Sequence, residues 1–431
     1  MITLGIETSC DETALALIET RIVNGVFECK VINSLVHSQA ELHSAYGGVF
    51  PTLAKREHGR NLVPLMRKLL ETSGIIGEKS TSTSPGKASL KEVLESFGSD
   101  FPAQNPDLFE SFDHADFLNN IPTIDSIAVT EGPGLEPALW VGINFARVLG
   151  ALWNIPVIPV NHMEGHIVGS LLNSEATNGT WQRLKNMDFP AIALLISGGH
   201  TELVKITSQE QSERVSDLSA VGQRQSGNTF RLRYSIIGQT KDDAVGEAFD
   251  KVARLLGLPY PGGPHISKLS HEAWEEKIES SVKLPRPMLR SGDLDFSFSG
   301  LKTAVLYAVR ANSGTDGQLT DVFKKGLARE FEDAVTETLD SKLRHAIESI
   351  GARTIIVGGG VSANHRLREQ FQKTADEFAI PLLLPTRHIS GDNALMIALA
   401  GALDSGSPLD LANPAKTPLK AQGTKRLGAE V

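Results

Sequence analysis

The sequence predicts a mixed α/β fold made of two related lobes, and two observations support that prediction. A strand-turn-strand pattern with a polar tip occurs at the start of the chain and again in its second half. Each half also contains a strand that ends in a glycine-rich turn and leads into a helix. At 431 residues the chain can form two lobes with a core each. We therefore expect an internal duplication of about 200 residues per half. The expected lobes are 1–186 and 187–431, and the last helix could pack back on the first lobe.

The first hairpin is expected from strands at 2–6 and 14–18, joined by the polar turn Glu7–Thr13. This tip offers backbone N–H groups, hydroxyls and the carboxylates of Asp11 and Glu12 to a phosphate or a hydrated cation. Taken alone, the tip is better interpreted as a solvated turn. The functional interpretation gains weight because the pattern recurs.

The recurrence lies at 191–206, where two apolar runs flank the small polar turn Ser197–Thr201. Two facing hairpin tips, one from each lobe, could hold the phosphates of a nucleotide against backbone N–H groups. Gly198 and Gly199 would let the backbone approach such a ligand closely.

Strand-to-helix turns are expected at Ser126–Gly134 and Thr354–Asn364, with helices beginning near Pro137 and His365. The carboxyl end of a strand before a helix is the usual place for a ligand in an α/β sheet. One glycine-rich turn is weak support, but three in a duplicated frame are stronger. No Walker-type phosphate loop is present in the sequence.

Other segments are expected to be peripheral. Helical periodicity occurs at 52–70 and 242–256. Residues 76–120 lack a sustained period, and we expect a surface insertion that is flexible at least in its first part. A second, smaller excursion is expected at 222–239. The basic tail with Lys416, Lys420, Lys425 and Arg426 could touch phosphates, although a solvated terminus is the favoured interpretation.

A metal site is predicted from His162 and His166, which follow the apolar strand 155–160. On a helix, this spacing places both imidazoles on one face, where they can share a cation with a third ligand. For that ligand we choose Asp392, although it could instead cap the apolar helix that follows. Two ordinary helix histidines remain the alternative. Peptide hydrolysis is disfavoured because Glu164 does not directly follow His162.

Composition restricts partners and compartment. With 41% hydrophobic and 22% charged residues the chain is typical of a globular protein. Its 51 acidic and 42 basic residues give a net charge of −9, so nucleic-acid binding would need a local basic patch or a partner. Two cysteines, Cys10 and Cys29, fit a reducing compartment. No signal peptide or membrane-spanning apolar run is visible, so we expect a cytoplasmic protein without membrane contact.

Seven motifs carry a family resemblance. They are Gly5–Thr13, Asn161–His166, Leu195–Thr201, Gly246–Lys251, Tyr260–Pro264, Phe296–Lys302 and Gly358–Asn364. Together they resemble the bacterial tRNA adenosine threonylcarbamoyltransferases, the TsaD family, over nearly the whole chain outside the two excursions. The resemblance implies the fold of the actin, hexokinase and heat-shock chaperone superfamily.

The resemblance also implies a reaction. The L-threonylcarbamoyl group of threonylcarbamoyl-adenylate would pass to the exocyclic N6 amine of the tRNA adenosine immediately 3′ of the anticodon, with release of AMP. Implied partners are tRNA, a paralogous scaffold subunit without the metal site, and a small ATPase. The implied metal ligands are His162, His166 and Asp392, which would hold iron(II), with zinc as the alternative. The implied adenylate-binding residues are Leu195, Ile196, Ser197, Gly198, Gly199, Asp250, Gly263 and Asn364.

Asp11 and Glu12 are our candidates for orienting the amine or taking its proton, because they lie in the first hairpin tip. Two other classes compete. A small-molecule kinase of the same superfamily would not need the histidine pair, and the scaffold subunit should lack all three metal ligands. The chain departs from the family in roughly 45 extra residues after the 52–70 helix and in Glu136–Trp140, which puts partner docking in doubt more than chemistry.

Overall fold

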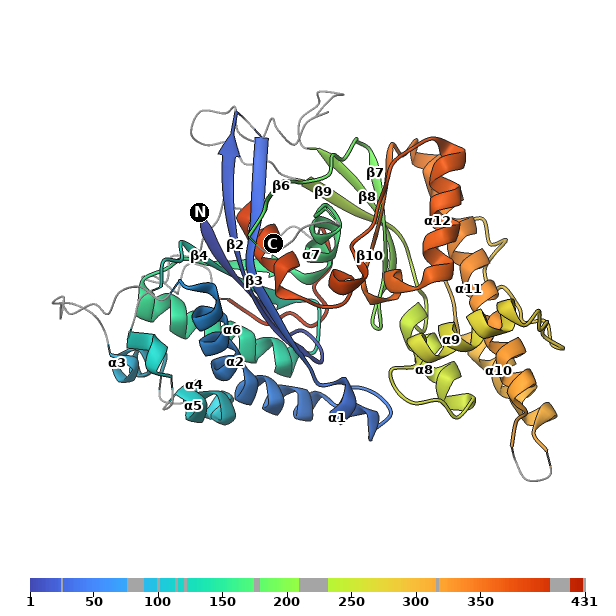
Figure 1. The fold of residues 1–431 in the computed structure, drawn as a ribbon, viewed down its shortest axis with the longest axis horizontal. Helices are drawn as coiled ribbons and strands as arrows, with labels where there is room; N and C mark the ends of the chain where they lie inside the picture. The colour runs from blue at the N-terminus through green and yellow to red at the C-terminus, as the bar shows by residue number, and fades with distance from the viewer. Residues whose placement is uncertain are drawn as a thin grey trace.

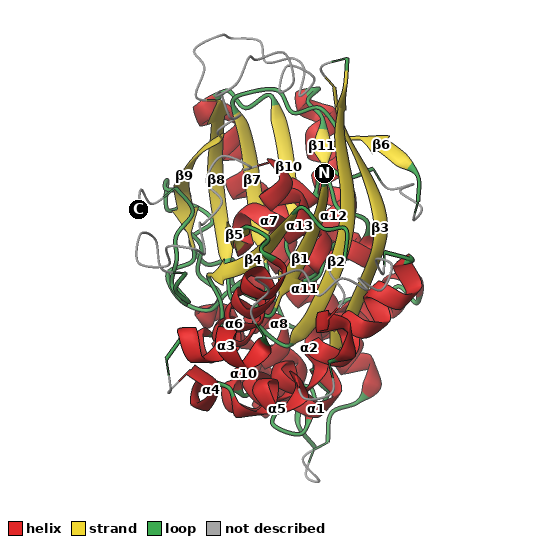
Figure 2. Cartoon of the chain, turned by 90° about the vertical axis from the view of Figure 1, so that its left-hand side faces the viewer, coloured by secondary structure: helices red, strands yellow, loops and turns green. Residues whose placement is uncertain are grey.

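The computed structural model describes residues 1–24, 26–75, 89–98, 101–112, 115–119, 122–173, 179–208, 232–314, 318–403 and 419–428. Two β-sheets organise these residues (Figures 1 and 2). The first sheet has the order β5-β4-β1-β2-β3-β6 and the second the order β11-β10-β7-β8-β9. The first sheet comprises β1 Ile2–Glu7, β2 Glu12–Val23, β3 Val26–Ser38, β4 Ser126–Gly132, β5 Val157–Asn161 and β6 Trp181–Arg183. The second comprises β7 Ala191–Ile196, β8 Thr201–Ser208, β9 Leu232–Gln239, β10 Thr354–Gly358 and β11 Leu382–Leu383.

The two sheets repeat one topology, which confirms the predicted duplication. In the first sheet β1 pairs antiparallel with β2 and parallel with β4, and in the second β7 pairs antiparallel with β8 and parallel with β10. The third strand of each set extends the hairpin antiparallel, and the fifth lies parallel beyond the fourth. The chain therefore has the expected two-lobed, duplicated α/β fold.

Helices cover both sheets. In the first half they are α1 Ala40–Ser44, α2 Pro51–Ser73, α3 Leu90–Ser96, α4 Phe101–Gln104, α5 Pro106–Phe112, α6 Glu136–Trp153 and α7 His162–Gly169. In the second they are α8 Val245–Leu255, α9 Gly262–Glu275, α10 Ser299–Asn312, α11 Asp321–Ile350, α12 His365–Phe378 and α13 Ala394–Leu403. Short 3-10 turns occur at Asp116–Asn119, Gly360–Ala363 and Arg387–Ile389. None of the described helices combines the length and apolar character needed to cross a bilayer.

Three buried clusters separate the layers, and strand alternation decides which residues enter which cluster. Leu15 and Leu17 of β2 face the cluster beneath α2 and α6. Ala14 and Ala16 of the same strand face a central cluster that also contains the inner face of β7 and residues of α7 and α13. The third cluster joins the outer face of β7 to α8, α11 and α12. The small alanines on the inner face leave room for helices between the sheets.

Helices α7 and α13 occupy equivalent places in the two halves, and both lie at the junction of the sheets. Helix α13 follows β11 of the second sheet but packs on β1, β2 and β4 of the first, while α7 follows β5 and packs on β7, β10 and α13. Gly5 permits this approach, since a Cβ there would lie 2.2 Å from the carbonyl oxygen of Ala394. The segments that begin α7 and α13 are thereby brought together. The lobe bounds 1–186 and 187–431 stay a prediction.

The insertion differs from its expected surface character. Residues 76–88, its expected flexible part, lie outside the described residues. Beyond them, α5 packs on α2 and α3 packs on α6. Phe101, Phe112 and Phe117 are buried in the core of the first lobe. The prediction missed this because each helix is too short for a period to emerge, although the capping box at Ser89, whose side chain bonds the Glu92 N–H, was a usable signal.

Two further expectations were wrong. The excursion predicted at 222–239 ends in strand β9, which pairs with β8, while 209–231 lie outside the described residues. The basic tail is not a solvated terminus over 419–428: Gln422 donates its N–H to the carbonyl of Glu131, and Lys425 forms an ion pair with the Glu131 carboxylate. Leu427 is buried. Lys420 and Arg426 are exposed, and Lys416 is outside the described residues.

Candidate active site

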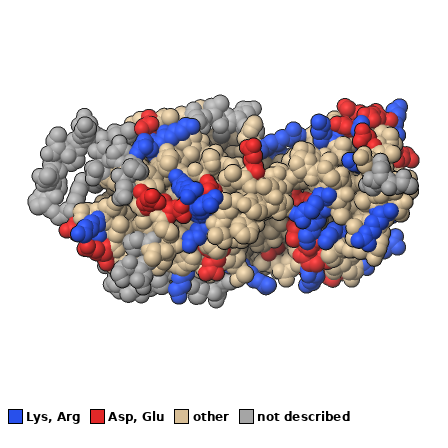
Figure 3. All heavy atoms as spheres, turned by 90° about the horizontal axis from the view of Figure 1, so that it is seen from below, with Lys and Arg blue, Asp and Glu red and all other residues tan. Residues whose placement is uncertain are grey.

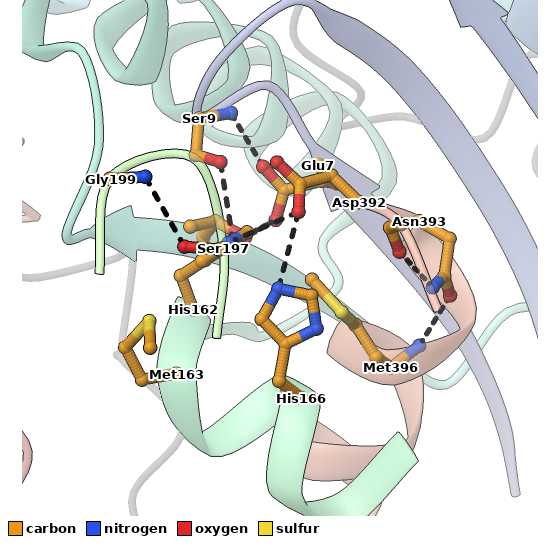
Figure 4. Close-up of polar contacts among 12 residues, drawn as sticks. Glu7, Ser9, His162, Met163, His166, Ser197, Gly199, Asp392, Asn393 and Met396 are labelled. Atoms are coloured by element: carbon orange, nitrogen blue, oxygen red, sulfur yellow. Dashed lines mark hydrogen bonds and ion pairs between the residues drawn. The ribbon is translucent and has the colours of Figure 1, made fainter. Parts of the chain in front are cut away.

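The histidines of α7 and the carboxylate before α13 meet at the junction of the two sheets (Figure 4). Helix α7 begins at His162 because Asn161 caps it, accepting the N–H of Met163 at 2.9 Å. The carboxylate oxygen Oδ1 of Asp392 lies 3.4 Å from Nε2 of His162 and 3.2 Å from Nε2 of His166. One ligand atom from each of the three residues falls within 4.8 Å of the others.

The electrostatics of this cluster suit a cation. Both imidazoles are buried, and in the described part of the chain Nε2 of His166 has no hydrogen-bond partner, only the contact with Asp392. Burial disfavours the charged forms, yet the imidazoles hold the pKa of the Asp392 carboxyl well below its usual range. Likewise Asp392 and Glu7 hold the pKa of His162 well above its usual range against the effect of burial. Two buried imidazoles that both face one carboxylate fit a divalent metal ion.

Asn393, and not Asp392, caps helix α13. The side-chain oxygen of Asn393 accepts the N–H of Met396 at 3.1 Å, which caps α13. The amide nitrogen of Asn393 donates to the carbonyls of Ile389 and Gly391 at 2.9 Å each and closes the loop that carries Asp392. Asp392 is therefore free of the capping role.

Sequence reasoning missed Glu7 as a partner of the histidines. Glu7 is fully buried at the end of β1, and its Oε2 lies 3.0 Å from Nδ1 of His162 and accepts the hydroxyl of Thr130 at 2.6 Å. Ser9 adds a hydroxyl 3.2 Å from the same ring nitrogen. A carboxylate on Nδ1 fixes the tautomer that leaves Nε2 available as a ligand. The available signal was only the position of Glu7 in the polar turn.

The first hairpin tip presents the two predicted carboxylates. Asp11 is buried and its backbone carbonyl accepts the N–H of Gln39 at 2.9 Å. The hydroxyl of Ser38 donates to Glu12 at 3.4 Å. Burial, and then the negative charges of Asp11 and Asp392, raise the pKa of Glu12 well above its usual range. The tip thus pairs two carboxyl groups whose environments differ.

The second tip is exposed at its glycines. The hydroxyl of Ser197 accepts the N–H groups of Gly199 at 3.3 Å and His200 at 3.1 Å, which closes the turn. Among the residues that the structure describes, nothing lies within 4 Å of the position that a Cβ would occupy on Gly198 or Gly199, so a ligand has room there. The side chains of Leu195 and Ile196 are fully buried in opposite faces of β7. These two residues could therefore reach a ligand only through their backbone.

Asp250 and Gly263 lie together, whereas the side chain of Asn364 is already engaged. Asp250 accepts the N–H of Gly262 at 2.7 Å, and burial raises its pKa. A Cβ on Gly263 would meet no described residue within 4 Å. Asn364 caps α12 through the N–H of Leu367, and its amide nitrogen donates to the hydroxyl of Ser267 and the carboxylate of Glu332.

Tyr260 lies near the first tip and Asp250, and the sequence analysis named it only as the first residue of a motif. Burial raises the pKa of its phenol, and the negative charges of Asp11 and Asp250 add to that effect. The charges of both carboxylates thus disfavour ionisation of the phenol. His200 lies near the two histidines of α7. Burial, and then the charges of His162 and His166, lower the pKa of His200 to about 4.

Comparisons with known proteins agree with this geometry. A family model for tRNA N6-adenosine threonylcarbamoyltransferase, TsaD, matches residues 30–81, 117–225 and 225–399. The chain belongs to this family. A TsaD-family enzyme of Burkholderia mallei is 39% identical over 407 residues, covering 94% of this chain and 92% of that protein. The relative in Burkholderia ambifaria is 38% identical over 96% of this chain and 95% of its own length. The relative in Nitrosospira multiformis is 36% identical over 94% and 92%.

Solved structures give a weaker likeness. Component A of (R)-2-hydroxyglutaryl-CoA dehydratase from Acidaminococcus fermentans is 9% identical, covers 93% of this TsaD-family chain and 96% of that chain, and gives a TM-score of 0.42. HypF of T. kodakarensis is 13% identical over 70% of this chain and 42% of its own, with a TM-score of 0.41. At these values the likeness adds nothing to the family assignment.

Proposed function

We propose that this protein transfers the L-threonylcarbamoyl group from threonylcarbamoyl-adenylate to the N6 amine of the tRNA adenosine immediately 3′ of the anticodon, releasing AMP. The observation that carries the proposal is that His162 and His166 of α7 meet Asp392, which lies just before α13. Each of these two helices packs against the sheet of the other half. Family membership over more than nine-tenths of the chain supports the same reaction. A small-molecule kinase would have no use for the imidazole pair.

In this proposal His162, His166 and Asp392 hold one divalent cation. Two imidazoles and one carboxylate are a donor set typical of non-haem iron(II), and zinc is the alternative. When bound, the cation supplies a Lewis acid that offsets negative charge on a phosphate oxygen. Glu7 accepts the Nδ1 proton of His162 and so keeps Nε2 turned toward Asp392.

The adenylate is expected to bind across the second tip and the start of α9. The backbone N–H of Gly198 would hold the phosphate, because both glycines are exposed and the N–H of Gly199 already donates to the Ser197 hydroxyl. Asp250 would accept a ribose hydroxyl with the carboxylate oxygen that does not bind Gly262. The purine would lie over the open backbone of Gly263. Leu195 and Ile196 would contribute only backbone, and Asn364 only the second lone pair of its amide oxygen.

The chemistry requires little from the protein beyond placement and charge. The substrate is a mixed anhydride, so the N6 amine can attack its carbonyl carbon directly. As the new C–N bond forms, the bond from the carbonyl carbon to the phosphate oxygen breaks, and AMP leaves with that electron pair. Asp11 takes the proton that the amine loses. Glu12, its neighbour in the first tip, orients the incoming amine.

Partners follow from the charge of the chain. A net charge of −9 gives no general attraction for a polyanion. Figure 3 shows Lys and Arg interspersed with Asp and Glu on the face seen from below. The family resemblance implies a paralogous scaffold subunit and a small ATPase, and their help in binding tRNA is part of the proposal. A cytoplasmic location stays a prediction from the sequence.

The test is direct. The purified chain is incubated with threonylcarbamoyl-adenylate and unmodified tRNA, with and without candidate partners, and the tRNA is digested for nucleoside analysis. The modified adenosine and an equal amount of AMP are expected. A tRNA with another base 3′ of the anticodon serves as the control, and Asp11→Ala should lose transfer. If no modified nucleoside forms under any of these conditions, the proposed function is wrong.

A further inference from the structure

Tyr46 and Phe50 form an exposed aromatic pair in the turn between α1 and α2. Tyr46 is 63% exposed and Phe50 is 50% exposed. Their rings stack with centroids 5.5 Å apart and planes inclined by 17°. Leu42, on the preceding helix, is also 47% exposed. Aromatic surface left in water is costly unless a partner covers it, so this pair requires an explanation.

The turn that carries the pair is held from both lobes. The N–H of Phe50 donates to Nδ1 of His43 at 3.2 Å, and the N–H of Tyr46 donates to the carbonyl of His43 at 2.9 Å. From the second lobe, the guanidinium of Arg254 donates to the carbonyl of Gly47. A rigid pair of stacked rings loses little conformational freedom when a third ring joins it.

The turn is tied to the first hairpin tip by a buried chain of hydrogen bonds. Because Nδ1 of His43 accepts the Phe50 N–H, its Nε2 donates to Oε1 of Gln39, at 3.3 Å. The amide nitrogen of Gln39 donates to Nδ1 of His58 at 3.2 Å, and Nε2 of His58 donates to the carbonyl of Cys10 at 3.0 Å. Cys10 directly precedes Asp11, our candidate proton acceptor.

The other anchor leads to the proposed adenylate site. Arg254 lies one helical turn after Asp250 on α8, and Figure 1 shows the loop after α1 facing α8. The aromatic pair is thus fixed between the element that carries Asp11 and the element that carries Asp250. Helix α2, which begins at Pro51 directly after the pair, has no side-chain cap and no acidic residue in its first turn. Pro51 has no N–H and that of Ala54 donates to the carbonyl of Phe50, so the N–H groups of Thr52 and Leu53 are the ones that favour a phosphate beside the rings.

We propose that Tyr46 and Phe50 form a stacking platform for an unpaired base of the RNA loop that contains the modified adenosine. This inference rests on the proposed function and names how that site recognises its RNA substrate. Sequence-specific proteins recognise RNA loops by splaying bases onto aromatic side chains, and every base offers a ring face for stacking. The uncapped start of α2 provides the charge complementarity that favours RNA over an apolar protein surface. A loop base near the reacting adenosine would stack on the platform, while the first hairpin tip holds the amine of that adenosine.

The test uses the full chain and a synthetic anticodon stem-loop RNA. 2-Aminopurine replaces one loop base at a time, and its fluorescence reports stacking on binding. Wild type should quench the probe at one or two loop positions. Tyr46→Ala combined with Phe50→Ala should abolish that quenching and raise the Kd for the RNA and the KM for tRNA by about tenfold or more. The kcat at saturating tRNA should change less than twofold, and Tyr46→Phe should retain most of the affinity.

Tyr307→Ala is the matched control, because Tyr307 is also 63% exposed but lies on α10. Equal RNA affinity of the double variant and wild type would overturn the inference, as would failure of wild type to bind the stem-loop both alone and with the candidate partner subunits. Loss of self-association in the double variant at unchanged RNA affinity would assign the pair to a protein interface and also overturn it. If wild type binds and quenches the RNA but never modifies it, the proposed function fails while the platform stands.

Discussion

Glu7 accepts a hydrogen bond from Nδ1 of His162 across 3.0 Å, although the two residues are 155 positions apart in the chain. The ring nitrogen that faces Asp392 is Nε2, so Glu7 decides whether the imidazole presents a lone pair or a proton there. A buried carboxylate at the end of β1 thereby orients His162 of α7, a proposed metal ligand. The first prediction follows from this contact.

Replacing Glu7 with Gln should weaken metal binding by about 10- to 100-fold, because a neutral amide accepts the Nδ1–H more weakly than a carboxylate and can instead donate to Nδ1 and favour the other tautomer. The protein is first freed of metal with a chelator, and calorimetric titration with Zn²⁺ then measures the binding affinity. Glu164→Gln is the matched control: Glu164 lies on α7 between the histidines, but it accepts the hydroxyl of Tyr234 at 2.9 Å. Equal affinities in the two variants would show that Glu7 does not support the site.

The sequence predicted the elements of the fold better than their contacts. The duplicated hairpins and glycine turns are local patterns, so both sheets could be foreseen from them. The spacing of His162 and His166 on a helix is also local. Glu7 carries no such signal, because its partner becomes apparent only once β1 and α7 lie side by side. The same is true of Asn393: Asp392 and Asn393 are both good caps, and only the structure distinguishes them.

In the insertion, the sequence did not predict which residues are buried. Its helices α3, α4 and α5 span seven, four and seven residues, too few to display a helical period. Their aromatic residues reach the core individually. Arg147 of α6, for example, lies over the ring of Phe97, with 4.4 Å from the guanidinium carbon to the ring centroid. Composition indicated a surface excursion, whereas tertiary contacts with α2 and α6 determine its structure.

Gly5→Ala should destabilise the protein by about 3 kcal/mol or more, because overpacking against rigid backbone cannot relax. The added Cβ would lie 2.2 Å from the carbonyl oxygen of Ala394 and 2.8 Å from the nitrogen of Ala398, so α13 must move away from β1. Since Asp392 precedes α13, Zn²⁺ affinity should fall as well. Urea unfolding and metal titration measure both effects. Gly300→Ala, whose Cβ would approach only Pro287 at 3.8 Å, should not lower either. A wild-type urea midpoint for Gly5→Ala would contradict the role given to this contact.

Phe112→Ala tests whether the insertion belongs to the core. Phe112 is 3% exposed and stacks on Phe145 of α6, with ring centroids 5.8 Å apart. Removing a buried phenylalanine costs about 3 to 5 kcal/mol, so a large drop in the urea midpoint is expected. Val322→Ala at a 62% exposed position should change the midpoint little. If both variants unfold alike, the insertion contributes no core packing.

His58 should make the stability of the protein depend on pH. The imidazole is fully buried, and burial lowers its pKa from 6.5 to about 4. Nε2 donates to the carbonyl of Cys10 while Nδ1 accepts the hydroxyl of Thr13 at 2.7 Å, so the folded state holds the neutral ring. Between pH 6.5 and 4, His58 is protonated in the unfolded chain but stays neutral in the folded chain. The free energy of unfolding should therefore be highest above pH 6.5, fall as the pH drops toward 4, and level off below it.

The size of this effect is about 3 kcal/mol, since each unit of pKa difference corresponds to about 1.4 kcal/mol. Urea unfolding of wild type and His58→Gln between pH 7.5 and 4, on an equal series of buffers, isolates it: the difference between the two proteins should shrink as the pH falls. His271→Gln is the control, because the His271 side chain is 70% exposed and should leave the pH profile parallel to that of wild type. If the His58→Gln profile also runs parallel to that of wild type, the buried neutral imidazole is not the source of the pH dependence.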